Sequence, residues 1–145
     1  MFKNILVPVD GSDNAYHALE YAVAVQKATG GSLTLLTIYR HHSMLEASLS
    51  MVRPGEPGNM DDVMRGHAKE VAEQAKKRAI ELGAADPRAF VRNGPVARGI
   101  VAFGEEHGID LIVIGSRGLG SVESYLLGSV SHKVTALADC PVLVV

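Results

Sequence analysis

Four residues near the C-terminal end have the types and the spacing of an anion site. Gly115, Gly118, Gly128 and Ser129 follow the pattern G-x2-G-x9-G-[ST] within LIVIGSRGLGSVESYLLGSVSHKV, residues 111–134. Glycine lets the backbone approach a ligand closely. The unpaired amides of a helix's first turn, helped by the helix dipole, then attract an anion. The pattern therefore predicts a site for phosphate groups, and we expect a side chain at Gly115 to block their approach.

The elements on either side of this loop fit the same interpretation. Residues 111–114 form a continuous apolar run, which is typical of a strand buried on both faces. After Ser129 the apolar period becomes helical, with Val130, Val134 and Leu137 on one stripe. Further donors in the segment are the guanidinium of Arg117 and the hydroxyls of Ser116, Ser121, Ser129 and Ser131.

Two better-known phosphate motifs are excluded. A Walker A loop requires a Gly-Lys pair, and the chain has none. The glycines at 115, 118 and 120 also miss the G-x-G-x-x-G spacing of a dinucleotide fingerprint. A hydrolytic triad of Ser129, His132 and Asp139 is unconvincing, because no G-x-S-x-G elbow precedes the serine.

Apolar runs and helical stripes alternate along the whole chain. They predict the order β-α-β-α-β-α-β-α-β and an open parallel α/β sheet with right-handed crossovers. We expect strands at residues 5–9, 33–39, 88–92, 111–114 and 141–145. The last strand is apolar and terminal, so we expect it at an edge of the sheet, where antiparallel pairing with a second copy would protect it.

The helices carry recognisable start and stop signals. Ser12 is expected to cap the first helix, with Ala15, Ala18, Leu19, Ala22 and Val25 facing the core and Gly30-Gly31 ending it. Asp61 is expected to open the second helix, which ends at Leu82-Gly83. Pro95 suits the first position of the third. Residues 41–59 form a long insertion, closed as a loop by Pro54, Gly55, Pro57 and Gly58.

Composition limits the function classes. The chain has 145 residues, 47% of them hydrophobic and 21% charged, which predicts a single globular domain over residues 1–145. A net charge of −2 gives no electrostatic case for nucleic acid. The apolar runs are too short to span a membrane, and the first residues do not form a signal peptide. A single cysteine, Cys140, fits a reducing cytoplasm.

Polar residues follow two of the predicted strands where each one ends. Asp10 comes directly after the first strand and Gly115 after the fourth. In open α/β sheets, ligands bind outside the carboxyl ends of the strands at the topological switch point. If these two strands are neighbours, Asp10 faces the glycine loop across one crevice and suits the hydroxyl or amino groups of a nucleoside. The alternatives are that Asp10 caps the first helix or stabilises the turn, that Gly115 serves packing alone, and that Ser129 is only a helix cap.

The chain resembles the universal stress protein family, in its ATP-binding branch, over essentially its whole length. The matching segments are ILVPVDGS at 5–12, GSRG at 115–118, LLGSVSHKV at 126–134 and the ending CPVLVV. The resemblance implies a three-layer sheet of order 3-2-1-4-5, like that of the adenine nucleotide alpha hydrolases. It also implies bound ATP, with ADP or AMP as alternatives and Mg²⁺ accompanying the phosphates. By matching position, the nucleotide-binding residues are Pro8, Val9, Asp10, Ile38, Ile114, Gly115, Arg117, Gly118, Gly128, Ser129, Val130 and Ser131.

The insertion suggests a narrower resemblance. Residues 41–54, HHSMLEASLSMVRP, resemble the insertion of TeaD-type members of the family, which accompany TRAP-type solute transporters. The leading hypothesis is a cytoplasmic ATP-dependent regulator that acts as a homodimer or larger oligomer, with such a transporter as a candidate partner. The rivals are a slow ATP hydrolase, for which the sequence offers no clear general base or metal site, and a nucleotide-free scaffold.

Overall fold

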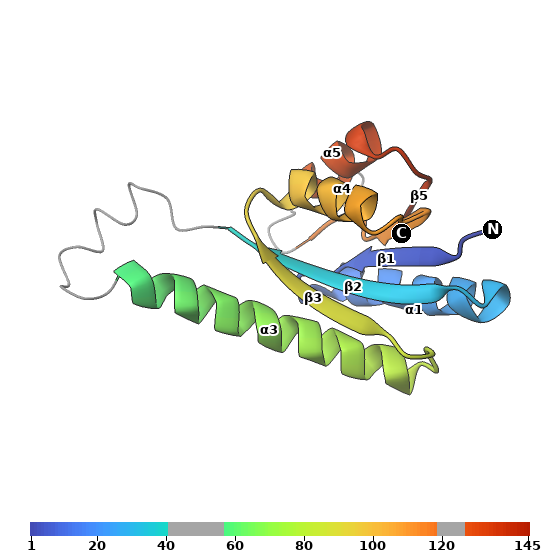
Figure 1. Ribbon diagram of the computed structural model, residues 1–145, viewed down its shortest axis with the longest axis horizontal. Coiled ribbons are helices and arrows are strands. Elements are labelled where there is room, and N and C mark those ends of the chain that lie inside the picture. The colour runs from blue at the N-terminus through green and yellow to red at the C-terminus, as the bar shows by residue number, and fades with distance from the viewer. Residues whose placement is uncertain (41–56, 119–126) are drawn as a thin grey trace.

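The computed structural model describes residues 1–40, 57–118 and 127–145. In this part of the chain five parallel strands form one sheet in the order β3-β2-β1-β4-β5 (Figure 1). The strands are β1 (Asn4–Pro8), β2 (Ser32–Tyr39), β3 (Arg88–Asn93), β4 (Leu111–Ile114) and β5 (Val142–Val144). The predicted strand order is therefore confirmed, and β5 lies at an edge as expected. At most of the strand ends, the observed boundary differs from the predicted one by a single residue.

The position of β1 creates the switch point. Ile5 pairs with Leu33 of β2 on one side and with Leu111 of β4 on the other. The chain therefore builds the sheet outward in one direction through β2 and β3, and then in the other through β4 and β5. Where this direction reverses, the carboxyl ends of β1 and β4 lie next to each other without a connection running across them.

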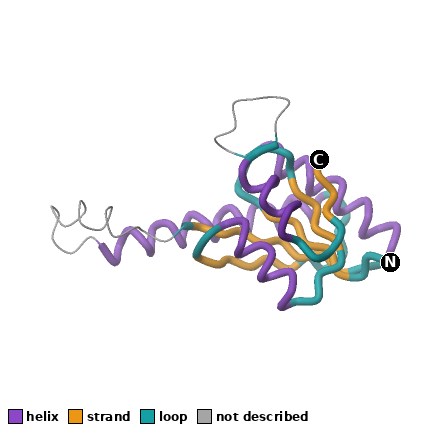
Figure 2. The backbone as a smooth tube through the Cα atoms, turned by 90° about the horizontal axis from the view of Figure 1, so that it is seen from above, coloured by secondary structure: helices purple, strands orange, loops and turns teal. Residues whose placement is uncertain are grey.

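Among the residues that the structure describes, four helices cover the two faces of the sheet (Figures 1 and 2). The helices are α1 (Asp13–Thr29), α3 (Pro57–Glu81), α4 (Val96–Glu106) and α5 (Ser129–Leu137). Helices α1 and α3 pack on the face that carries Ile5, Val7 and Leu35, and α4 and α5 pack on the face that carries Leu6 and Leu36. Because successive strand residues point to opposite faces, β4, which is buried on both faces, is apolar throughout.

Helix α1 begins and ends where the sequence predicted. The side chain of Ser12 accepts a hydrogen bond of 3.2 Å from the amide of Ala15, and Gly30 ends the helix at φ 72°. The buried stripe includes Val23 and Gln26, whereas Val25 is only partly buried. Gln26 is tolerated there because its side-chain amide bonds Gly31 and both backbone groups of Ala85.

Three local predictions are wrong. Helix α3 begins at Pro57, not at Asp61, because proline in a first turn needs no amide partner; the rest of the insertion, residues 41–56, lies outside the described residues. Pro95 is the N-cap of α4 and not its first helical residue. Leu137 is 44% exposed, because Ala138 continues the i, i+4 stripe of Val130 and Val134 in its place.

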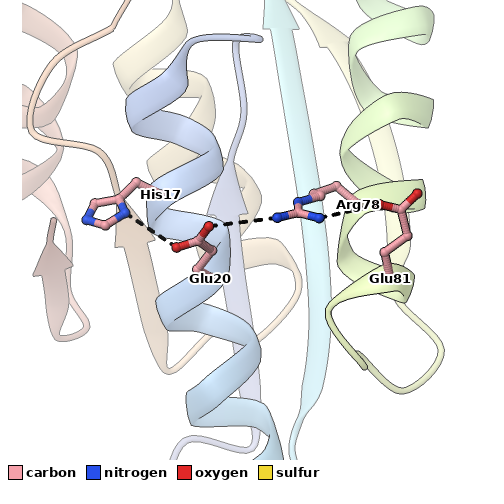
Figure 3. Close-up of polar contacts among 4 residues, drawn as sticks. All are labelled: His17, Glu20, Arg78 and Glu81. Carbon is pink, nitrogen blue, oxygen red and sulfur yellow. Dashed lines mark hydrogen bonds and ion pairs between the residues drawn. The ribbon is translucent and has the colours of Figure 1, made fainter.

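Charged side chains connect α1 to α3 at the surface (Figure 3). The guanidinium of Arg78 lies 4.0 Å from a carboxylate oxygen of Glu20 and 3.4 Å from one of Glu81. The ring of His17 lies 3.5 Å from the other oxygen of Glu20. All four side chains are about half exposed, so solvent screens these pairs.

Candidate functional site

A cavity of about 760 Å³ opens at the carboxyl ends of β2, β1 and β4. Its size is in the range of small-molecule sites. All twelve residues that the sequence predicted as binding residues line this one cavity: Pro8, Val9, Asp10, Ile38, Ile114, Gly115, Arg117, Gly118, Gly128, Ser129, Val130 and Ser131. The topology brings them together from β1, β2, β4 and the start of α5.

The two ends of the cavity differ in chemistry. On the side of β2 and α4 the walls include the apolar residues Leu36, Ile38, Val96 and Ile100, with the exposed Arg40 after β2. On the side of β4 and α5 they include Gly118, Arg117 and the residues that begin α5. Such a cavity suits a ligand with a flat apolar group at one end and negative charge at the other.

The start of α5 supplies backbone donors. Gly128 is the N-cap, and no side-chain hydrogen bond caps the helix. The first backbone hydrogen bond of α5 runs from the amide of His132 to the carbonyl of Gly128, at 3.0 Å. The amides of Ser129, Val130 and Ser131 therefore precede the hydrogen-bonded turns and have no partner within the helix. Ser129 is the first helical residue and so is not the cap. The dipole of α5 adds to the attraction of these amides for an anion.

The hydroxyl of Ser131 holds the loop and is not free for a ligand. Ser131 is buried, and its Oγ donates to the carbonyl of Ser116 at 2.8 Å and to that of Gly128 at 3.1 Å. The amide of Gly128 donates to the same Ser116 carbonyl at 2.6 Å. These bonds fasten the residues after β4 to the start of α5. The predicted role of the Ser131 hydroxyl as an anion donor is corrected, although its backbone amide remains available.

The two glycines after β4 have different reasons to be glycine. A Cβ atom at Gly115 would lie 2.9 Å from the backbone oxygen of Asn14, so Gly115 permits β4 to pack against the start of α1. Gly115 thus has a packing reason to be glycine, and the expected block of the phosphates by a side chain stays a prediction. At Gly118 a Cβ atom would lie 2.5 Å from Oδ2 of Asp10. Both residues line the cavity.

Asp10 lies next to the glycine loop, with its carboxylate beside Gly118, and both residues line the cavity. Its Oδ1 accepts a 2.9 Å hydrogen bond from the amide of Ser12, which fixes the turn between β1 and α1. The helix itself is capped by Ser12, so Asp10 does not cap α1, whereas the alternative that Asp10 stabilises the turn is confirmed. With one oxygen held by the turn, Oδ2 is the atom that borders Gly118.

Arg117 has a buried nitrogen that lacks a protein partner. Its Nε is shielded from solvent, and none of the described residues accepts a hydrogen bond from it. A buried donor without an acceptor costs free energy unless a ligand or water supplies one. Arg117 therefore does not simply extend into solvent, and a bound anion would satisfy it.

Seven residues that line the cavity were not predicted from the sequence. They are Ser12, Ala15, Leu36, Arg40, Val96, Ile100 and Leu127. The period of two along β2 was the available signal for Leu36, which shares a strand face with the predicted Ile38. Val96 and Ile100 gave no signal of their own, since only the packing of α4 places them here.

The described residues offer little to a metal ion. Over residues 1–40, 57–118 and 127–145 there is no cluster of three or more His, Cys, Asp or Glu side chains suited to metal binding. Asp10 is the only carboxylate among the described cavity residues. In the same described ranges, none of the helices combines the length and the hydropathy that a membrane crossing requires.

Known proteins of one family match this chain over its whole length. Residues 1–145 match the model of the universal stress protein family. The chain is 36% identical over 148 residues to the universal stress protein YxiE of Bacillus subtilis, covering 100% of this chain and 99% of that one. The solved structure of universal stress protein UspA from Lactobacillus plantarum superposes with a TM-score of 0.84 at 29% identity, covering 99% and 97% of the two chains.

A further solved relative contains a nucleotide. It is a universal stress protein in complex with cAMP, with a TM-score of 0.72 and 25% identity over 99% of this chain and 96% of that one. The family match and the structural superpositions thus point to one family. The chain belongs to the universal stress protein family.

Proposed function

We propose that this chain binds an adenine nucleotide in the cavity, with ATP as the main ligand, and acts as a nucleotide-dependent regulator. The observation that carries the proposal is the difference between the cavity's ends: apolar walls from β2 and α4 with Arg40 at the rim, and backbone donors with Arg117 toward β4 and α5. The cAMP complex of a relative supports the ligand class.

The residues present fit such a ligand. The base occupies the apolar end beside Ile38, and the phosphates meet the amides of residues 129–131. Arg117 contributes its charge and its unpaired Nε to the same phosphates. Asp10 accepts a hydrogen bond from a ribose hydroxyl. Mg²⁺, when present, is carried by the phosphates, with Asp10 as the one described carboxylate within the cavity.

Binding has a structural consequence that a partner can detect. The phosphates contact both the end of β4 and the start of α5, two segments that are otherwise joined through Ser116 and Ser131. A ligand that binds the joined arrangement more tightly stabilises it and shifts the population toward it. A second copy pairing along β5, where Leu143 is 37% exposed, and a TRAP-type transporter are the candidate partners.

The test begins with the purified protein. Bound nucleotide is extracted and identified, ATP–Mg²⁺ binding is measured by calorimetry, and phosphate release is followed over time. We expect ATP binding with negligible turnover. Brisk turnover would instead favour an ATP hydrolase, and no binding would favour a nucleotide-free scaffold.

A charge-matched pair of variants locates the phosphates. Arg117→Ala is expected to lower ATP affinity at least roughly tenfold, because charge-assisted bonds are worth about 1.5–3 kcal/mol. Arg98→Ala removes the same charge from an exposed position of α4 outside the cavity lining and should leave affinity unchanged. Adenosine, which has no phosphate, should bind both variants equally. Equal ATP binding by the two variants would contradict the assignment of Arg117.

A further inference from the structure

A second arginine lines the cavity, at the end opposite to Arg117. Arg40 directly follows β2, and its side chain is exposed at the rim. The order β3-β2-β1-β4-β5 places β1 between β2 and β4. Since neighbouring strands are about 4.8 Å apart, β2 lies roughly 10 Å from β4. Arg40 therefore lies at the base end of the cavity and not at the phosphate end.

Arg40 carries the hydrogen-bonding side chain among the lining residues at the end of β2 and on α4. Leu36, Ile38, Val96 and Ile100 are the other lining residues from β2 and α4, and none has a hydrogen-bonding side chain. Among the described residues, no hydrogen bond or ion pair engages the guanidinium of Arg40. Its donors are thus available to a ligand.

The walls of the apolar end fix which part of a base Arg40 can meet. Ile38 packs closely against α4, since a Cβ atom at Gly99 would lie 2.7 Å from Cδ1 of Ile38. A flat base bound here covers its faces with apolar side chains from β2 and α4. With its faces covered in this way, a bound base would turn an edge toward the rim where Arg40 lies.

A guanidinium discriminates between purine edges. It has five donors and no acceptor, so it matches adjacent acceptors. Guanine and hypoxanthine present N7 and O6 side by side, and arginine binds that pair with two parallel bonds. Adenine presents N7 beside an amino group, which is itself a donor, so only one of the two bonds forms.

We propose that Arg40 reads the N7/O6 edge of the base and so lets this cavity accept 6-oxopurine nucleotides, such as GTP and ITP, beside ATP. The inference rests on the proposed nucleotide site and adds the base specificity of that site. Arg40 is a specificity-determining residue in this view, with no part in binding the phosphates.

The test compares three nucleotides on matched variants. Affinities for ATP, ITP and GTP are measured by calorimetry on the wild-type chain and on Arg40→Ala, Arg40→Lys and Arg98→Ala. ITP differs from ATP only at the 6-position and the adjoining ring nitrogen. We expect ITP and GTP to bind the wild type within roughly tenfold of ATP. Arg40→Ala should lower their affinities about tenfold more than that of ATP, and Arg40→Lys should lose most of the same preference. Arg98→Ala should change no ratio.

A modified ligand isolates the proposed bond. In 7-deaza-GTP the N7 acceptor is replaced by a C–H group. It should bind the wild type more weakly than GTP, and the two should bind Arg40→Ala equally, as in a double-mutant cycle. Thermal unfolding of each variant verifies that it is folded.

The outcomes separate this inference from the proposed function. If ATP binds and the ITP/ATP ratio is unchanged by Arg40→Ala, the inference is wrong and the nucleotide site stands. If Arg40→Ala weakens ATP, ITP and inorganic tripolyphosphate by one common factor, Arg40 attracts phosphate and the inference is again wrong. If the wild type binds no nucleotide, both the site and the inference fail.

Discussion

The carboxylate of Asp10 lies directly against the α-carbon of Gly118, so that a Cβ atom on Gly118 would come within 2.5 Å of Oδ2. This contact joins the end of β1 to the loop that follows β4, across the switch point of the sheet. Both residues line the cavity. Any side chain at residue 118 must therefore displace the one carboxylate among the described cavity residues.

Gly118→Ala tests this contact. We expect nucleotide affinity to fall about tenfold or more, because the methyl group displaces Asp10 from the ribose. Stability should change little, since Gly118 is not among the glycines at positive φ and alanine is conformationally allowed there. Calorimetry with ATP–Mg²⁺ and thermal unfolding measure the two effects. An unchanged ATP affinity in the folded variant would contradict the assigned role of Asp10.

Gly115 should behave in the opposite way. Gly115→Val brings a side chain against the backbone of Asn14, so we expect a loss of about 1–3 kcal/mol in the free energy of unfolding, as for overpacked cores. Gly66→Ala is the matched control: it lies in α3 with nothing within 4 Å of a Cβ, and should gain up to about 1 kcal/mol. Urea denaturation measures both. A fully stable Gly115→Val protein would show that β4 and α1 are not packed as described.

Ser131 and Ser129 form another contrasting pair. Ser131→Ala removes the buried hydroxyl that bonds the carbonyls of Ser116 and Gly128, and should cost about 1 kcal/mol of stability. Ser129→Ala, at an exposed position beside it, should be nearly neutral. The comparison uses chemical denaturation, with proteolysis of the loop as a second readout. Equal stability of the two variants would rule out the loop-fastening role of Ser131.

The ion pairs between α1 and α3 should contribute little to the free energy of unfolding. Arg78→Ala removes the contacts with Glu20 and Glu81 (Figure 3). Because these side chains are about half exposed, we expect a loss of no more than about 1 kcal/mol, smaller still in high salt. Denaturation at low and high ionic strength measures the difference. A larger loss that salt does not reduce would point to packing by the arginine stem.

Cys140 should react slowly with alkylating reagents. Burial raises the pKa of its thiol above the ordinary value, and the nearby carboxylates of Asp110 and Asp139 add to the shift. A raised pKa means less thiolate at neutral pH, and the thiolate is the nucleophile. Iodoacetamide labelling should therefore be slower than in urea-unfolded protein at pH 7.5, and should accelerate only above the usual thiol range. Equal rates in the folded and unfolded chains would contradict the burial of the thiol.

The sequence by itself determined the elements and twelve of the residues that line the cavity. Period and punctuation placed five strands and four helices to within a few residues, because buried parallel strands are mostly apolar and helices bury one stripe. The G-x2-G-x9-G-[ST] spacing and the position of Asp10 identified one crevice, since parallel strands bring their carboxyl ends to one edge of the sheet. Pro57 misled the prediction of α3 because proline is compatible with both a loop and a first helical turn.

Only the tertiary structure decided what each site residue contacts. Sequence spacing cannot reveal that Gly115 meets Asn14 while Gly118 meets Asp10, because both neighbours come from a segment about a hundred residues away along the chain. It also cannot reveal that the Ser131 hydroxyl is engaged by Ser116, or that Arg40 shares a cavity with Arg117. These relationships depend on how α1, α4 and α5 pack against the sheet, and packing is set by the summed contacts of side chains from the whole chain.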